Sequence, residues 1–153
     1  MSSLPQRPDK TIDVSTAILI RCPRDEVAKF AADPDNAAKW YLNIKSVEWK
    51  TPKALAPGAR IAFQAQFLRR KLAYVYEIVE FVPQERLVMR TDRPLLMETT
   101  YTWESIDEHS TRMTLRNRGN PTGFSKLFRP ILPFAIKLAN RKDLQRLKTI
   151  LEQ

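Results

Sequence analysis

The stretch FSKLFRPILPFAIKLANRKDLQRLKTILEQ, residues 124–153, decides the fold of this chain. Its apolar residues recur at helical steps of three and four, with a drift between positions 139 and 143: Leu127, Phe128, Ile131, Ala135, Leu138, Leu144, Leu147 and Leu151. We expect one long helix, capped by Thr122 and kinked where Pro130 and Pro133 each remove a backbone donor. The preceding part of the chain alternates with the period of strands. A long helix cannot fill the concave face of a curved sheet, so this order predicts a cavity that holds apolar molecules.

The alternation of apolar and polar residues predicts the strands, and the positions of proline predict where the two short helices begin. The first strand covers residues 12–20. Pro23 suits the start of a helix that ends near residue 32, and Asp33-Pro34 repeats the signal for a second helix that ends near residue 40. Six more strands, joined by short turns, are expected at residues 44–50, 61–67, 72–82, 87–91, 97–104 and 112–118. The prediction is an α+β domain with a seven-stranded curved antiparallel sheet wrapped around a long C-terminal helix, and two short helices between the first and second strands.

Composition excludes several classes of site. Cys22 is the single cysteine and His109 the single histidine, so we expect no internal disulfide and no metal. With three glycines in the chain, neither a dinucleotide-binding nor a phosphate-binding glycine loop can be written, and we expect no cofactor. Residues 1–10 look like a disordered leader without the apolar core of a signal peptide, and residues 11–153 form one domain. No apolar run approaches the ~20 residues that cross a bilayer, so the expected location is cytoplasmic.

The net charge of +9 is concentrated at the C-terminal end of the chain. Residues 110–153 contain ten Lys and Arg against Asp143 and Glu152. A basic face attracts nucleic acid, an anionic membrane or an acidic partner, but it can equally be a solvated helix flank that keeps the protein soluble. Sequence motifs for specific nucleic-acid recognition are absent. We therefore expect at most a peripheral contact with an anionic membrane, and the sequence does not fix the oligomeric state.

The concave face of the expected sheet supplies candidate ligand contacts. Strand parity selects Phe63, Phe67, Tyr74, Tyr76, Met89, Met97, Tyr101, Met113 and Asn117, with Trp103 on the same face. Phe128 on the apolar stripe of the final helix and Trp40 at the end of the second short helix complete the candidate contacts. Their aromatic rings and sulfur atoms suit a flat or flexible apolar guest, although most could equally be core. The tyrosine hydroxyls and the inward amide of Asn117 need partners when buried, either in the protein or on a guest.

No catalytic constellation can be written, and the catalytic residues are unknown. Glu77 is the carboxylate that burial in a strand could turn into a general acid or base, but an outward position opposite an arginine is favoured. His109 follows Asp107 and Glu108 in a turn far from the expected cavity. Neither a Ser-His-acid nor a Cys-His arrangement is supported.

Several stretches together resemble the START-like (SRPBCC) superfamily of helix-grip ligand binders, including its polyketide cyclase/dehydrase group. They are IRCPRDEV at 20–27, Asp33-Pro34 before Lys39-Trp40, Pro57-Gly58, EIVEFVP at 77–83 with Arg86-Leu87, and DLQRLK at 143–148. The resemblance covers residues 12–152; the chain departs from it in lacking glycine at residues 107–110 and in its charged tip at 69–71.

The resemblance implies one START-like domain whose cavity, between sheet and final helix, binds a small hydrophobic molecule such as a lipid, polyketide or aromatic compound. It also implies that Trp40 lies near the mouth of this cavity. Carriers and enzymes share this fold, so the resemblance does not choose between them. A soluble binder or carrier is the leading hypothesis. A polyketide cyclase/dehydratase-like enzyme using the same cavity is the alternative, and an interaction module using the basic C-terminal face is the second alternative.

Overall fold

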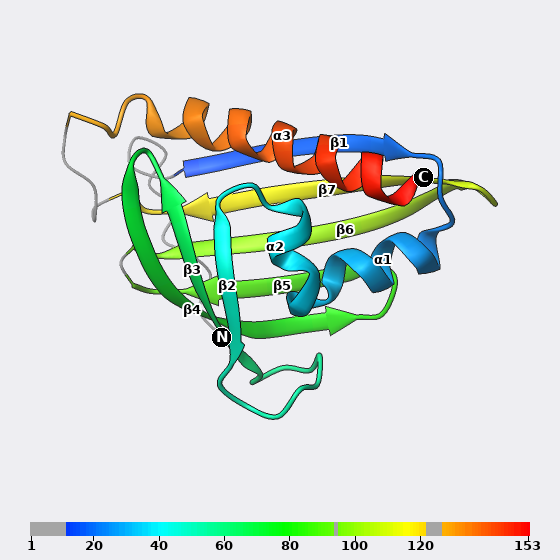
Figure 1. Ribbon diagram of the computed structural model, residues 1–153, viewed down its shortest axis with the longest axis horizontal. Coiled ribbons are helices and arrows are strands. Elements are labelled where there is room, and N and C mark those ends of the chain that lie inside the picture. Colours follow the sequence, from blue (N-terminus) through cyan, green and yellow to red (C-terminus); the bar gives the residue numbers. More distant parts are fainter. Residues whose placement is uncertain (1–11, 94, 122–126) are drawn as a thin grey trace.

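The computed structural model describes residues 12–93, 95–121 and 127–153, and its architecture confirms the predicted fold class. In chain order the elements are β1 (Ile12–Ile20), α1 (Arg24–Ala32), α2 (Ala37–Trp40), β2 (Ile44–Trp49), β3 (Arg60–Phe67), β4 (Arg70–Val82), β5 (Arg86–Thr91), β6 (Met97–Asp107), β7 (Ser110–Gly119) and α3 (Leu132–Leu151). The strands form one antiparallel sheet in the order β1-β7-β6-β5-β4-β3-β2. Helix α3 lies along β1 on the same face of the sheet as α1 and α2 (Figure 1).

The final helix begins later than its periodicity predicts. Residues 127–131 form turns and α3 starts at Leu132, so Pro130 precedes the helix and Pro133 lies in its first turn. A proline there loses no helical hydrogen bond, because the first N–H groups of a helix have no partner within it. The predicted kink inside the helix is therefore wrong. The predicted cap, Thr122, lies outside the described residues.

The two short helices close one side of the sheet's concave face. A single 3-10 turn, Pro34–Asn36, joins them, and the Asp33 carboxylate accepts a hydrogen bond from the Asp35 N–H at 2.9 Å. Small residues on α1 let this helix approach the sheet closely, and Trp40 at the end of α2 is fully buried. The helices thereby bring the chain after Trp40 against α3.

Sheet curvature comes in part from β4. Its pairing with β5 shifts register between Ile78 and Glu80, and such an irregularity bends a strand and increases its twist. The β3–β4 hairpin consequently turns toward the first turns of α3 (Figure 1). Leu68 at the hairpin tip packs against the buried cluster that contains Leu132 and Ile136, which confirms this approach.

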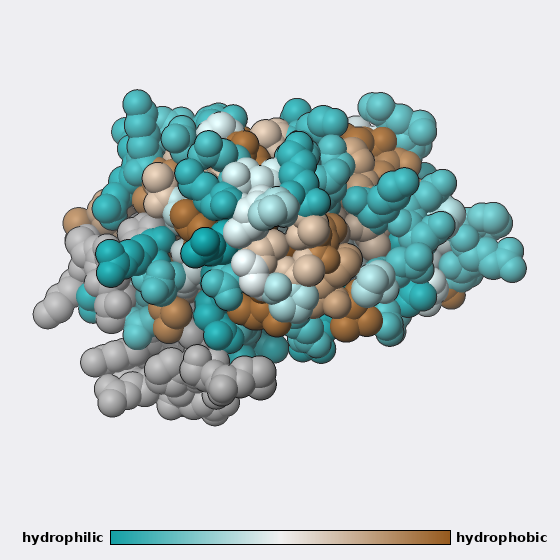
Figure 2. Space-filling view, turned by 90° about the horizontal axis from the view of Figure 1, so that it is seen from below, coloured by the Kyte–Doolittle hydropathy of each residue, from teal (hydrophilic) through white to brown (hydrophobic). Residues whose placement is uncertain are grey.

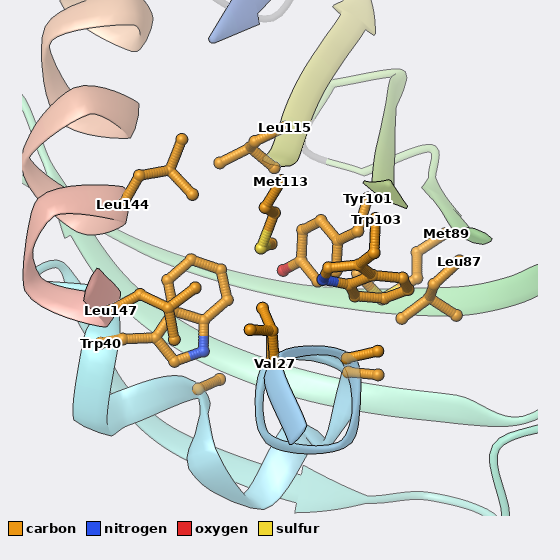
Figure 3. Packing of buried hydrophobic residues seen from close by; sticks show 14 of the residues in the cluster. Val27, Trp40, Leu87, Met89, Tyr101, Trp103, Met113, Leu115, Leu144 and Leu147 are labelled. Atoms are coloured by element: carbon orange, nitrogen blue, oxygen red, sulfur yellow. The ribbon is translucent and has the colours of Figure 1, made fainter. Parts of the chain in front are cut away.

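The apolar core has two parts. The larger cluster joins the C-terminal half of α3 to the sheet and to α1, and Figure 3 shows Leu144, Leu147, Val27 and Met113 pointing toward one another. The smaller cluster holds Ile12 and Val14 with the start of α3. Seen from below, hydrophilic residues cover most of the surface (Figure 2). In the described part of the chain, no helix is long and apolar enough to cross a membrane.

Candidate functional site

A cavity of about 190 Å³ lies between the sheet, α2 and α3, with members of both core clusters on its wall. Most of the lining is aliphatic or aromatic; polar groups enter from strands β4 to β7, from α3 and from the segment that follows α2. For comparison, an engineered cavity of about 150 Å³ lined by apolar side chains binds benzene. The space thus matches a guest of about one or two rings.

The structure sorts the predicted contact residues into three groups. Lining the cavity are Phe63, Phe67, Tyr74, Tyr76, Met89, Met97, Tyr101 and Asn117. Trp40, Met113 and Trp103 are buried in the larger core cluster and are not part of the cavity wall. Phe128 lies exposed in the turns before α3, because the helix that would have turned it inward begins at Leu132. Contact with a ligand stays a prediction for all of them.

Aromatic rings form one wall of the cavity. Tyr74 and Tyr76 are two residues apart on β4 and therefore share a face of the sheet, with ring centroids 5.5 Å apart in an edge-on arrangement. Phe63 on β3 lies 6.0 Å from the Tyr74 ring and 5.9 Å from the Tyr76 ring. Two of these three ring pairs are edge-to-face, an arrangement that favours fixed ring positions, so the three rings form a well-packed apolar wall.

A chain of polar side chains runs across the cavity from β4 to α3. The Tyr76 and Thr99 hydroxyls are 3.2 Å apart, and the Asn117 amide nitrogen donates to Thr99 Oγ1 at 2.9 Å. Asn140 on α3 donates to Asn117 Oδ1 at 2.6 Å. The Asn117 amide thus points inward, as strand parity predicts, and its partners are side chains rather than the backbone.

A second polar contact joins α2 to the sheet. The hydroxyls of Tyr41, which follows α2, and Tyr101 on β6 are 2.5 Å apart. Burial raises the pKa of both phenols well above the ordinary value, and it raises the pKa of Tyr76 to about 12. These hydroxyls are therefore neutral at physiological pH and serve as hydrogen-bond donors and acceptors.

Asp143 is the functional candidate that the sequence interpretation missed. It lines the cavity from α3, is 3% exposed, and accepts a hydrogen bond at Oδ1 from the Leu42 N–H at 3.0 Å. Burial raises the pKa of its carboxyl from 3.8 to about 6, and no described Lys or Arg forms an ion pair with it. The signal was present: Ile136, Asn140, Asp143 and Leu147 share one helical face, so two polar residues interrupt the buried stripe.

The two other titratable candidates lie outside the cavity. Glu77 is exposed on the outer face of β4, in register with Arg60 and Arg90, which confirms the favoured outward position. Arg90 forms its ion pair with Glu98. His109 is exposed in the β6–β7 turn, where its N–H donates to Asp107. Among the described residues, no group of three His, Cys, Asp or Glu side chains is placed to hold a metal ion.

Comparison with known proteins places this cavity in context. Residues 11–152 match the model of a family described as polyketide cyclase/dehydrase and lipid transport. Among curated proteins, none matches significantly.

Solved structures share the fold at low sequence identity. A protein from Thermus thermophilus is 18% identical with a TM-score of 0.76, over 90% of this chain and 94% of that one. The aromatase/cyclase Zhui from Streptomyces sp. R1128 is 14% identical with a TM-score of 0.79, over 93% and 94%. A START superfamily protein from Mycobacterium smegmatis is 10% identical with a TM-score of 0.78, over 92% and 97%. These three likenesses concern the fold.

Proposed function

The chain belongs to the polyketide cyclase/dehydrase and lipid transport family, and we propose that it binds a small, largely apolar molecule in the cavity between the sheet and α3. The observation that carries this proposal is the cavity itself, whose wall of aromatic and aliphatic side chains is interrupted by a few buried polar groups. Ligand pockets generally combine these two features, because apolar area supplies affinity and isolated polar groups fix the orientation.

The size and polarity of the cavity restrict the class of ligand that it can bind. A compound of one or two rings that buries about 200 Å² of apolar surface gains about 5 kcal/mol at ~25 cal/mol per Å². The rings of Phe63, Tyr74 and Tyr76 would contact its apolar body. Asp143 offers a carboxylate with one hydrogen bond from the described chain, so a hydroxyl or amine donor on the guest would find an acceptor there.

A cavity-filling variant with a matched control tests the proposal. Ala65 lines the cavity from β3, whereas Ala73 on the neighbouring strand is exposed on the opposite face. With 2-naphthol as a fluorescent probe, we expect saturable binding to the wild type and to Ala73→Phe, and at least about ten-fold weaker binding to Ala65→Phe. Circular dichroism checks that each variant folds, and Ala139→Phe fills the cavity from α3 if Ala65→Phe does not.

A broader search uses the same proteins. Gently purified wild type is mixed with a library of lipids and aromatic compounds and examined by native mass spectrometry. Retention of a library compound by Ala73→Phe but not by Ala65→Phe would support the cavity as the binding site. Retention of no apolar compound by the wild type, or equal binding by the two variants, would refute the proposal.

A second candidate function, a cyclase/dehydratase-like enzyme, rests on Asp143. A carboxyl with a pKa near 6 can take up and release a proton near neutral pH, as a general base or acid requires. In an aldol closure of a polyketide chain, its carboxylate would take the proton from a carbon between two carbonyls. A neutral hydroxyl, such as that of Tyr101, would then donate a hydrogen bond to the carbonyl oxygen under attack.

The Asp143→Asn variant separates the two candidates. A synthetic poly-β-ketone thioester is incubated with each protein, and ring formation is followed by liquid chromatography and mass spectrometry. An enzyme should lose ring formation in Asp143→Asn while still binding naphthalene, which has no hydrogen-bond donor, and Asp13→Asn on the surface should change neither property. The absence of any ring formation above background with the wild type would leave the binder as the function.

A further inference from the structure

The segment that precedes and begins α3 exposes five large apolar side chains. Leu127 is 80% exposed and Phe134 73%, and Phe128, Ile131 and Leu138 each expose more than a third of their surface. Ile131, Phe134 and Leu138 are spaced by three and four residues, so they share the outer face of the helix, opposite the buried Leu132 and Ile136. Soluble proteins scatter exposed apolar residues singly; a cluster of this kind marks an interaction surface.

Basic residues surround this apolar surface. Residues 127–142 contain four Lys and Arg and no Asp or Glu. Arg141 and Lys142, one turn beyond Leu138, are exposed and have no ion pair with a described residue. Arg69 and Lys71 are exposed at the β3–β4 hairpin tip, which packs beside the first turns of α3 (Figure 1). Asp143, the nearest acidic residue along the helix, faces the cavity instead.

We propose that residues 127–142, with the β3–β4 hairpin tip beside them, form a docking surface for an anionic phospholipid bilayer. Apolar side chains insert at the boundary between headgroups and acyl chains, and flanking Lys and Arg are attracted to anionic headgroups. A nucleic acid would use the basic residues but leave Phe134 and Leu127 in water. A second copy of the chain would cover the apolar residues but bring two sets of like charges together.

The docking surface adjoins the cavity. Leu132 and Ile136 line the cavity from the inner side of the same helical turns whose outer side carries Ile131, Phe134 and Leu138. Docking would therefore hold the first turns of α3, and with them one wall of the cavity, against the lipid surface. The docking itself does not depend on whether the cavity holds a guest.

Vesicle sedimentation with matched variants tests the docking surface. Wild type should bind phosphatidylcholine vesicles that contain phosphatidylserine and bind pure phosphatidylcholine vesicles much more weakly. Phe134→Asp and Leu138→Asp should each weaken binding at least about ten-fold, since each puts a charge in place of apolar surface that the bilayer would bury. Arg141→Ala and Lys142→Ala should weaken it about five-fold each, with a smaller effect at high salt.

Ile106→Asp is the matched control. Ile106 is 45% exposed near the β6–β7 turn, at the opposite end of the molecule from the start of α3 (Figure 1), so its substitution should leave vesicle binding unchanged. Vesicle binding that does not depend on phosphatidylserine, or that falls equally in Ile106→Asp and Phe134→Asp, would overturn the proposal. So would a dimer that Phe134→Asp dissociates without any vesicle binding by the wild type. RNA binding that depends on Arg141 but not on Phe134, again with no vesicle binding, would also overturn it.

Discussion

Asp143→Asn should stabilise the protein at neutral pH. Burial raises the pKa of the Asp143 carboxyl from 3.8 to about 6, so the folded protein holds this proton more tightly than the unfolded chain does. The contribution of Asp143 to the free energy of unfolding is therefore most favourable below about pH 4. It declines as the pH rises to about 6 and is constant above that. At 1.36 kcal/mol for each pH unit, the carboxylate costs up to about 3 kcal/mol at neutral pH.

Asparagine removes the charge while keeping the local hydrogen bond. Its amide oxygen can accept the Leu42 N–H that Asp143 Oδ1 accepts at 3.0 Å. Urea unfolding of both proteins, followed by tryptophan fluorescence, measures the effect. The stability gained by Asp143→Asn should be larger at about pH 7.5 than at about pH 4.5 by about 2 kcal/mol.

The exposed carboxylate of Asp13 serves as a control, because its contribution to stability should change with pH in the opposite direction. The hydrogen bond from Arg116 lowers the pKa of Asp13, so this carboxylate stabilises the fold above its ordinary pKa, and the contribution is lost as the pH falls. The pair is about half exposed, so Asp13→Asn should destabilise the protein by about 1 kcal/mol or less at neutral pH. If Asp143→Asn lowers stability at neutral pH, or if its gain does not grow with pH, the account of a buried, unpaired carboxylate is refuted.

Three further predictions test the polar network and the burial of individual side chains. Asn140→Ala should lower the free energy of unfolding by about 1–3 kcal/mol, because Asn117 Oδ1 loses its buried donor; an unchanged value in urea unfolding would contradict the polar network. Leu147→Ala should cost about 2–5 kcal/mol in the same assay and Leu138→Ala under about 0.5, and equal losses would count against their assigned burial. Burial raises the pKa of the Cys22 thiol to about 11, so iodoacetamide should alkylate the folded protein far more slowly than the urea-unfolded chain; similar rates would show the thiol to be accessible.

Strand parity made most of the sheet predictable. Tyr74 and Tyr76 face the cavity while Val75 and Glu77 face outward, because successive side chains of β4 point to opposite faces. Helical periodicity was less reliable at the start of α3. Leu127, Phe128 and Ile131 continue the helical spacing, but their apolar character belongs to an exposed surface rather than to a buried helix face, and spacing alone cannot distinguish the two.

Strand parity could not predict which inward-facing side chains line the cavity and which are enclosed in the core. Parity assigns Tyr101 and Met113 to the concave side of the sheet, yet the first lines the cavity and the second is enclosed in the core. The difference depends on which helix covers each point of the sheet. Met113 belongs to the cluster that includes Leu144 and Leu147, whereas the cavity extends toward the start of α3. Such packing depends on long-range contacts that no local pattern contains.

Asn140 and Asp143 were missed in the sequence because the buried face of an amphipathic helix is recognised by its apolar residues. Asp143 is nevertheless the residue on which the distinction between the two proposed functions depends. A cost of about 3 kcal/mol is a large fraction of the 5–15 kcal/mol that stabilises a typical domain. Structure alone does not require the charge, because asparagine would satisfy the Leu42 N–H and neighbouring Asn140 already shows that an amide fits this face of the helix. Under the proposed function, this charge would serve the molecule that the cavity binds: a guest with a hydrogen-bond donor, or a substrate that gives up a proton. The two cases differ in Asp143→Asn, which in a binder weakens donor-bearing guests more than purely apolar ones, and in an enzyme removes turnover while binding persists.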